Sequence, residues 1–113
     1  MKITDEEWFE LQFHRDVALQ KYAIEIPDLP ADDIQLGYTG QTGRSNLQQA
    51  FSFYKHLRVT CGMEEVSSPR VLDFGGGFGR ISRLFLRDTK VDQILVFART
   101  WVVLLGRKLL KWN

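Results

Sequence analysis

Four of the nine glycines in this 113-residue chain lie between residues 75 and 79, within the stretch VLDFGGGFGR. The apolar run before them ends in Asp73 and Phe74, which is typical of a buried strand that leads directly into a loop. Glycines let such a loop turn tightly, and they let its backbone approach a ligand above the carboxyl end of the strand. The cluster therefore predicts a ligand-binding loop, with a simple tight turn as the alternative.

The residues around this loop predict one strand–helix–strand unit. We expect a strand at residues 70–74, a helix from about Phe78 to Arg87 and a second strand at residues 93–98. This order is the signature of a parallel sheet, and it predicts an α/β fold.

The amino-terminal part of the chain is predicted to form helices joined by a loop. Thr4 or Asp5 can cap a first helix, because apolar residues then recur at three- and four-residue intervals. These residues are Trp8, Leu11, Ala18, Leu19 and Tyr22. A second helix is expected to open at Ser45, with a glutamine three residues later as a capping box, and to end at Gly62. Residues 26–44 contain two prolines and three glycines, which predicts a long ordered loop between the helices.

The spacing of the glycines separates the ligand classes that use such loops. A phosphate loop ends in Gly-Lys-Ser/Thr, whereas Gly79 is followed by Arg80 and Ile81. The dinucleotide pattern G-x-G-x-x-G fits Gly75 and Gly77, but its third glycine would fall on Arg80. What remains is the pattern D-x-G-x-G-x-G, which begins at Asp73.

With this pattern, the sequence resembles the first motif of the class I S-adenosylmethionine-dependent methyltransferases. The upstream stretch GYTGQTGRSNLQQAFSFYKHL also resembles the segment that precedes this motif in a subgroup of these enzymes. The resemblance covers roughly residues 35 to 95, and it implies a partial Rossmann-like methyltransferase fold, with N-terminal helices followed by the first strand–helix–strand unit. It also implies S-adenosyl-L-methionine as the cofactor and methyl transfer as the reaction.

The resemblance assigns roles to particular residues. Asp73 would hold the ammonium end of the cofactor, since a carboxylate suits a cationic ligand, and the loop backbone would lie against its methionine part. Arg80 could pair with the cofactor carboxylate, or it could lie on the solvated surface. Tyr38 and Arg44 precede the first strand, where related enzymes fold a segment over the cofactor, so we expect one of them to contact the methionine end or to cover the pocket. The implied cofactor-binding residues are Asp73, Phe74, Gly75, Gly76, Gly77, Phe78, Gly79, Tyr38 and Arg44.

The chain departs from the family pattern after Asp92. The second strand of these enzymes normally ends in an acidic residue that binds the cofactor ribose, but the sequence here reads QILVFARTW, and no Asp or Glu follows Asp92. We therefore expect a single partial domain, divided into helices and lid loop (1–69), the cofactor unit (70–98) and an atypical tail (99–113). As given, this fragment is expected to be inactive, and its second strand is expected to form an unpaired, association-prone edge.

The tail FARTWVVLLGRKLLKWN is basic and apolar, and two interpretations compete. It could be an amphipathic helix that touches an anionic membrane or a partner, which would make the chain a non-catalytic binding module. Alternatively, it could be non-native sequence introduced by a frameshift or a truncation. In either case the apolar tail could fold back onto the open sheet.

Composition limits the remaining classes of function. A formal net charge of +1 gives no overall field toward nucleic acid, and the one cysteine, Cys61, rules out an internal disulfide. The acidic start MKITDEEWFE does not resemble a signal peptide, so we expect a cytoplasmic protein. The longest apolar stretch, residues 94–106, is interrupted by Arg99 and is too short to span a bilayer. The sequence identifies neither the methyl acceptor nor the oligomeric state.

Overall fold

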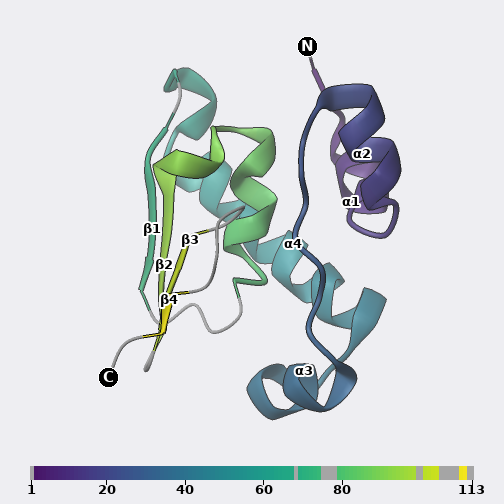
Figure 1. The fold of residues 1–113 in the computed structure, drawn as a ribbon. Helices are drawn as coiled ribbons and strands as arrows, with labels where there is room; N and C mark the ends of the chain where they lie inside the picture. Colours follow the sequence, from purple (N-terminus) through teal and green to yellow (C-terminus); the bar gives the residue numbers. More distant parts are fainter. Residues whose placement is uncertain (1, 68, 75–78, 99–100, 105–109, 112–113) are drawn as a thin grey trace.

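The computed structural model describes residues 2–67, 69–74, 79–98, 101–104 and 110–111. Within these residues the chain is a mixed α/β structure, in which the helices lie on one side of a small sheet (Figure 1). The helices are α1 (Asp5–Leu11), α2 (Arg15–Tyr22), α3 (Asp32–Thr39), α4 (Gly43–Thr60), and the 3₁₀ turns η1 (Met63–Glu65), η2 (Ser82–Arg87) and η3 (Val91–Gln93). The strands are β1 (Val71–Phe74), β2 (Ile94–Ala98), β3 (Trp101–Leu104) and β4 (Leu110–Lys111).

The first predicted helix is two helices. Thr4 caps α1 as expected, since its Oγ1 accepts a hydrogen bond from the backbone N–H of Glu7 at 3.2 Å. The prediction of one continuous helix to Tyr22 is wrong, because the chain turns between Leu11 and Arg15. An unbroken helix over these 18 residues would be about 27 Å long. The turn instead lets α1 bury Trp8 and Leu11 while α2 packs Ala18 against the same core.

The predicted loop at residues 26–44 contains the helix α3, so that prediction is wrong. Most of the prolines and glycines flank this helix rather than interrupt it. The two prolines precede the helix, and Gly40 ends it with a left-handed φ of 74°. The next helix, α4, begins at Gly43 and not at Ser45, and its cap Thr42 makes no side-chain bond. The predicted capping box is therefore wrong, and the distant side chain of Gln35 caps this helix by accepting from the Gly43 N–H at 2.9 Å.

The sheet has the order β1-β2-β3-β4 and begins with the predicted parallel pair, in which Val71 lies opposite Ile94. Two further strands follow in antiparallel register. Where it is described, the tail is thus extended and paired with the sheet rather than helical, which contradicts the amphipathic-helix interpretation. The same pairing contradicts the prediction that the second strand is an unpaired edge, because β3 lies beside it.

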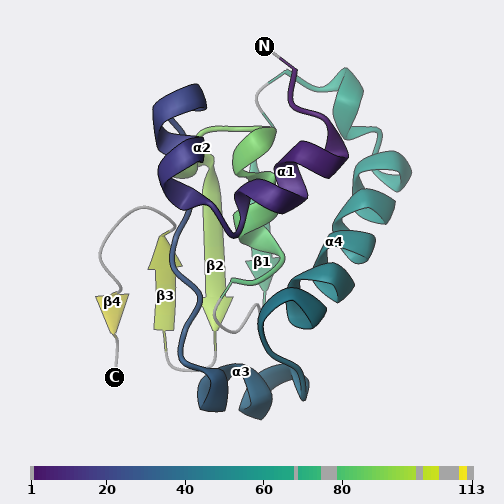
Figure 2. The same ribbon diagram turned by 90° about the vertical axis from the view of Figure 1, so that its right-hand side faces the viewer.

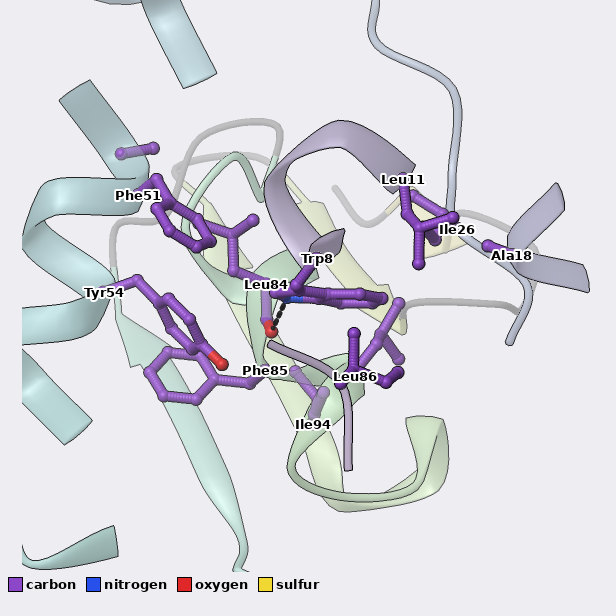
Figure 3. Close-up of a cluster of buried hydrophobic side chains, with 12 residues drawn as sticks. Trp8, Leu11, Ala18, Ile26, Phe51, Tyr54, Leu84, Phe85, Leu86 and Ile94 are labelled. Carbon is purple, nitrogen blue, oxygen red and sulfur yellow. Dashed lines mark hydrogen bonds between the residues drawn. The ribbon is translucent and has the colours of Figure 1, made fainter. Parts of the chain in front are cut away.

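The core lies between the sheet and the helices, and Trp8 is at its centre (Figure 3). The Trp8 ring is fully buried, and its Nε1–H donates to the backbone oxygen of Leu84 at 2.8 Å. The helix predicted for residues 78–87 is only the short 3₁₀ turn η2, whose residues 82–86 are all buried. Because this turn is enclosed between β1, β2 and α4, it has no exposed helical face.

Candidate functional site

The candidate site begins with Asp73, the third residue of β1. In a strand, alternate side chains share a face. Asp73 therefore lies on the same face as Val71, which packs against the core, while Leu72 on the opposite face is 64% exposed. The Asp73 carboxylate accepts a short hydrogen bond from the hydroxyl of Ser82, which is fully buried at the start of η2. One oxygen of the Asp73 carboxylate is thus held by Ser82, which lies nine positions later in the chain.

The glycine segment is described only at its two ends. The backbone of Phe74 completes β1, and Gly75, Gly76, Gly77 and Phe78 lie outside the described residues. Gly79 is buried and has a φ of 78°, a conformation that residues with a Cβ rarely adopt. Its carbonyl oxygen accepts from the N–H of Arg83 at 3.0 Å. The positive φ of Gly79 explains why a glycine stands at this position. The ligand role of the other glycines stays a prediction.

Arg80 connects the end of the glycine segment to α4. Its Nη1 donates to the side-chain oxygen of Gln49 at 3.2 Å and lies 3.5 Å from the backbone oxygen of Asn46. Arg80 is half-buried, so it is neither a free surface cation nor a group directed only at a ligand. The first half of α4 is consequently held against the residue that follows Gly79.

A polar cluster joins α3 to the start of α4. The Oε1 of Gln35 accepts from the Gly43 N–H and from the Asn46 Nδ2, each at 2.9 Å, and the Gln35 Nε2 donates to the Pro30 oxygen at 2.8 Å. Gln35 and Asn46 are both buried. In Figures 1 and 2, α3 lies at the level of the carboxyl ends of β1 and β2, on the helical side of the sheet. The helix α3, which carries Tyr38, thus lies toward the end of the sheet at which β1 and β2 finish.

Tyr38 and Arg44 are the two residues before β1 that were predicted to contact or cover the ligand. Tyr38 lies in α3, and its side chain is outside the described part of the structure. Arg44 points to α1, where its two terminal nitrogens donate to the Glu10 carboxylate at 2.7 and 3.2 Å and its guanidinium lies 4.3 Å from the ring centre of Phe13. This ion pair raises the pKa of Arg44 and lowers the pKa of Glu10. The structure therefore does not bring the guanidinium of Arg44 together with Asp73.

Arg83 anchors the amino-terminal segment to η2 beside Ser82. It is 2% exposed, and it donates to the Gln12 Oε1 at 3.1 Å and to the Pro27 oxygen at 2.5 Å. Burial lowers the pKa of Arg83 to about 10, and the nearby charge of Arg15 acts in the same direction. These bonds hold the end of α1 and the chain between α2 and α3 against the short turn that begins at Ser82.

Within the described residues, no group of three His, Cys, Asp or Glu side chains could hold a metal ion. In the same part of the chain, no helix is both long enough and apolar enough to cross a membrane. Comparisons with models of protein families, with curated proteins and with solved structures found no match to this chain. The site is therefore interpreted from its own geometry and chemistry.

Sequence reasoning did not identify Ser82, Asn46 or Gln35. A signal for Ser82 was present, because a small hydroxyl residue follows the loop by three positions and can reach back to the acid before it. Neither amide residue carries a local signal. Their contact joins positions 11 residues apart across a turn that the sequence did not predict.

Proposed function

We propose that this chain forms the methionine-binding half of a class I S-adenosylmethionine-dependent methyltransferase site, in a partial Rossmann-like fold. The observation that carries the proposal is the position of Asp73. It lies near the carboxyl end of the first strand of a parallel pair, is oriented by a buried serine, and stands directly before the glycine segment. Open parallel sheets bind ligands outside the carboxyl ends of their strands.

The chemistry of these groups suits the cationic amino-acid end of the cofactor. Ser82 occupies one oxygen of the Asp73 carboxylate and leaves the other to accept from an ammonium group. Residues 75–79 carry no side chain except at Phe78, so their backbone N–H groups can approach a ligand closely. The bound cofactor would supply an electrophilic methyl group, and the task of the chain is to align it with an acceptor nucleophile.

In the described part of the chain, β2 ends without an acidic residue for the opposite half of the cofactor. In the family, an acid at the end of the second strand binds the ribose, whereas β2 here is ILVFA and ends at Ala98. The neighbour of β2 on its far side is the antiparallel strand β3. We therefore propose that the 113-residue chain binds the cofactor weakly and does not complete methyl transfer by itself.

A titration followed by NMR tests the binding proposal. S-adenosylhomocysteine is added at millimolar concentration to the ¹⁵N-labelled chain, and we expect the backbone signals of Asp73, residues 75–79 and Ser82 to shift. Asp73→Asn should abolish these shifts. The matched control is Asp92→Asn, an exposed acid just before the amino end of β2, which should leave them unchanged. Shifts that are absent, or that persist in Asp73→Asn, would overturn the proposal.

A further inference from the structure

An unexplained polar atom on the helix contacted by Arg80 is the side-chain oxygen of Asn46. Asn46 is 0% exposed, and its Oδ1 has no hydrogen-bond donor in the described part of the chain. A buried amide oxygen that has left water without gaining a partner is costly, and such atoms in native proteins call for an explanation. Binding of a donor from a ligand would supply one.

The orientation of this amide is set by its neighbours. The Gln35 Oε1 already accepts from the Gly43 N–H, and it accepts from the Asn46 Nδ2 as well. Rotating the Asn46 amide by half a turn would place its oxygen against the Gln35 oxygen, so that two acceptors would face each other. The arrangement therefore directs the Asn46 Oδ1 away from Gln35 and keeps it available as an acceptor.

The position of Asn46 links it to the glycine segment. Arg80, the residue after Gly79, reaches the backbone oxygen of Asn46 and the side chain of Gln49, one helical turn later on the same face of α4. The adjoining helix α3 lies at the carboxyl ends of β1 and β2 (Figure 2). Asn46 is therefore a buried acceptor on the helix that Arg80 contacts, and Arg80 directly follows the segment that we assign to the ligand.

We propose that the Asn46 Oδ1 accepts a hydrogen bond from the α-ammonium group of the ligand and so helps to select ligands that carry this group. This inference rests on the proposed function. An ammonium group has three N–H donors and no acceptor, so one carboxylate oxygen of Asp73 cannot satisfy it alone. A second, uncharged acceptor adds directionality without adding another buried charge.

The test compares S-adenosylhomocysteine with its desamino analogue, in which hydrogen replaces the α-amino group. Affinities of the full 113-residue chain are measured by NMR titration for the wild type and for Asn46→Ala. We expect Asn46→Ala to weaken binding of S-adenosylhomocysteine about tenfold, because a hydrogen bond to a charged group is lost, and to leave the desamino analogue unaffected. Gln48→Ala, an exposed neighbour on α4, should change neither affinity.

The other outcomes overturn specific parts of the argument. Equal weakening of both ligands would show that Asn46 only supports the fold, and no weakening of either would show that it does not contact the ligand. If the wild type binds neither compound, the proposed function fails together with this inference. If Asn46→Ala does not fold, the side-chain NH₂ signals of Asn46 in the wild type decide. They should shift with S-adenosylhomocysteine and not with the desamino analogue, and the opposite result rejects the proposal.

Discussion

Ser82 is the residue on which the orientation of the Asp73 carboxylate depends. It is fully buried, and its hydroxyl donates to a side chain that is otherwise only partly enclosed. A hydrogen bond to a charged group contributes more to stability than one between neutral groups, because the acceptor carries a full charge. Ser82 therefore has a structural role and also positions Asp73, the acid that we propose binds the ligand.

Replacing this serine should lower stability. We expect Ser82→Ala to reduce the free energy of unfolding by about 1.5 kcal/mol, measured by urea denaturation. The control is Ser52→Ala, because the exposed Ser52 hydroxyl donates only to the backbone oxygen of Gln48 at 3.1 Å, and its loss should cost less than about 0.5 kcal/mol. Equal losses in the two variants would show that the bond to Asp73 is energetically unimportant.

Gly77 is predicted from the sequence pattern to lie where the ligand meets the backbone. Gly77→Val would add a branched side chain at that approach, so we expect S-adenosylhomocysteine binding to be lost while the fold is kept. An equilibrium titration measures binding, and circular dichroism with urea unfolding checks the fold. Unchanged affinity in a folded Gly77→Val variant would reject the ligand role of this glycine.

At this scale the sequence identified residues whose neighbours are close in the chain. Asp73 and the glycines were singled out by their spacing along the chain, and their ligand role stays a prediction. The contact of Arg44 with Glu10 was not predicted, because the two residues are 34 positions apart and nothing local marks the pair. Asn46 was missed for the same reason, since its amide is fixed by Gln35 across the turn between two helices.

Among the elements, the helices show where sequence reasoning succeeds and fails. The long helix α4 was predicted to within two residues at its start, because its apolar residues form a clear stripe. The helix α3 was missed because its stretch was judged by its number of prolines and glycines rather than by their positions. Most of these residues mark boundaries, and only Gly37 lies inside the helix.

Two glycines of this region should respond in opposite directions to alanine. Gly62 follows α4 with a φ of 62°, so Gly62→Ala should cost about 1 kcal/mol in backbone strain. Gly37 lies within α3, and Gly37→Ala should add roughly 0.5–1 kcal/mol of stability. A Cβ at either position would meet no atom within 4 Å, so packing does not confuse the comparison. Thermal unfolding of both variants measures the effects, and changes of the same sign would contradict this account.

A hydrogen-bond network around Tyr54 joins α4 to the end of η2. Its buried hydroxyl donates to the Asp88 carboxylate at 2.6 Å and accepts from the Arg87 Nε at 3.0 Å, while Arg58 donates to the same carboxylate at 2.9 Å. Burial raises the pKa of Tyr54 well above its ordinary value, and the bond to Asp88 acts in the same direction. The folded protein thus keeps this tyrosine protonated where the unfolded chain loses the proton.

The sign of the pH dependence follows from this shift. The contribution of Tyr54 to stability is fully present below the unfolded pKa of about 10 and decreases as the pH rises above it, because only the unfolded state then releases the proton. We expect Tyr54→Phe to lower stability at neutral pH and to flatten the decline between about pH 9.5 and 11. Urea denaturation across this range measures both effects. Parallel profiles for the wild type and Tyr54→Phe would contradict the assignment.

For the molecule as a whole, the parallel pair of β1 and β2 at one edge of the sheet was predictable, and the two antiparallel strands that continue the sheet were not. The pair followed from two apolar runs separated by a helix-length segment. The tail departs in composition from the rest of the chain, and this change suggested an amphipathic helix or non-native sequence. Where it is described, it supplies β3 and β4, whose pairing covers the β2 edge that was expected to be free. Apolar residues near an open edge can gain hydrogen bonds and burial there whatever their origin.

We predict that the 113-residue chain does not transfer methyl groups. The proposed site has groups for the methionine end but no acid at the end of β2, and each missing charge-assisted bond weakens binding about tenfold or more. Incubation with labelled S-adenosylmethionine and a cell extract should show no labelled product. Calorimetry should give an affinity weaker than about 10 μM, equivalent to about −7 kcal/mol. Turnover or tighter binding would mean that less of the fold is needed than we infer.

The bond between the indole of Trp8 and the carbonyl oxygen of Leu84 spans 76 residues. During synthesis on the ribosome, α1 therefore emerges long before the turn that completes its packing. Through most of translation the indole N–H of Trp8, the largest side chain of the core, lacks its native acceptor, and the ring remains only partly enclosed. Its fluorescence, which depends on this enclosure, should change only when residues 82–94 have left the exit tunnel.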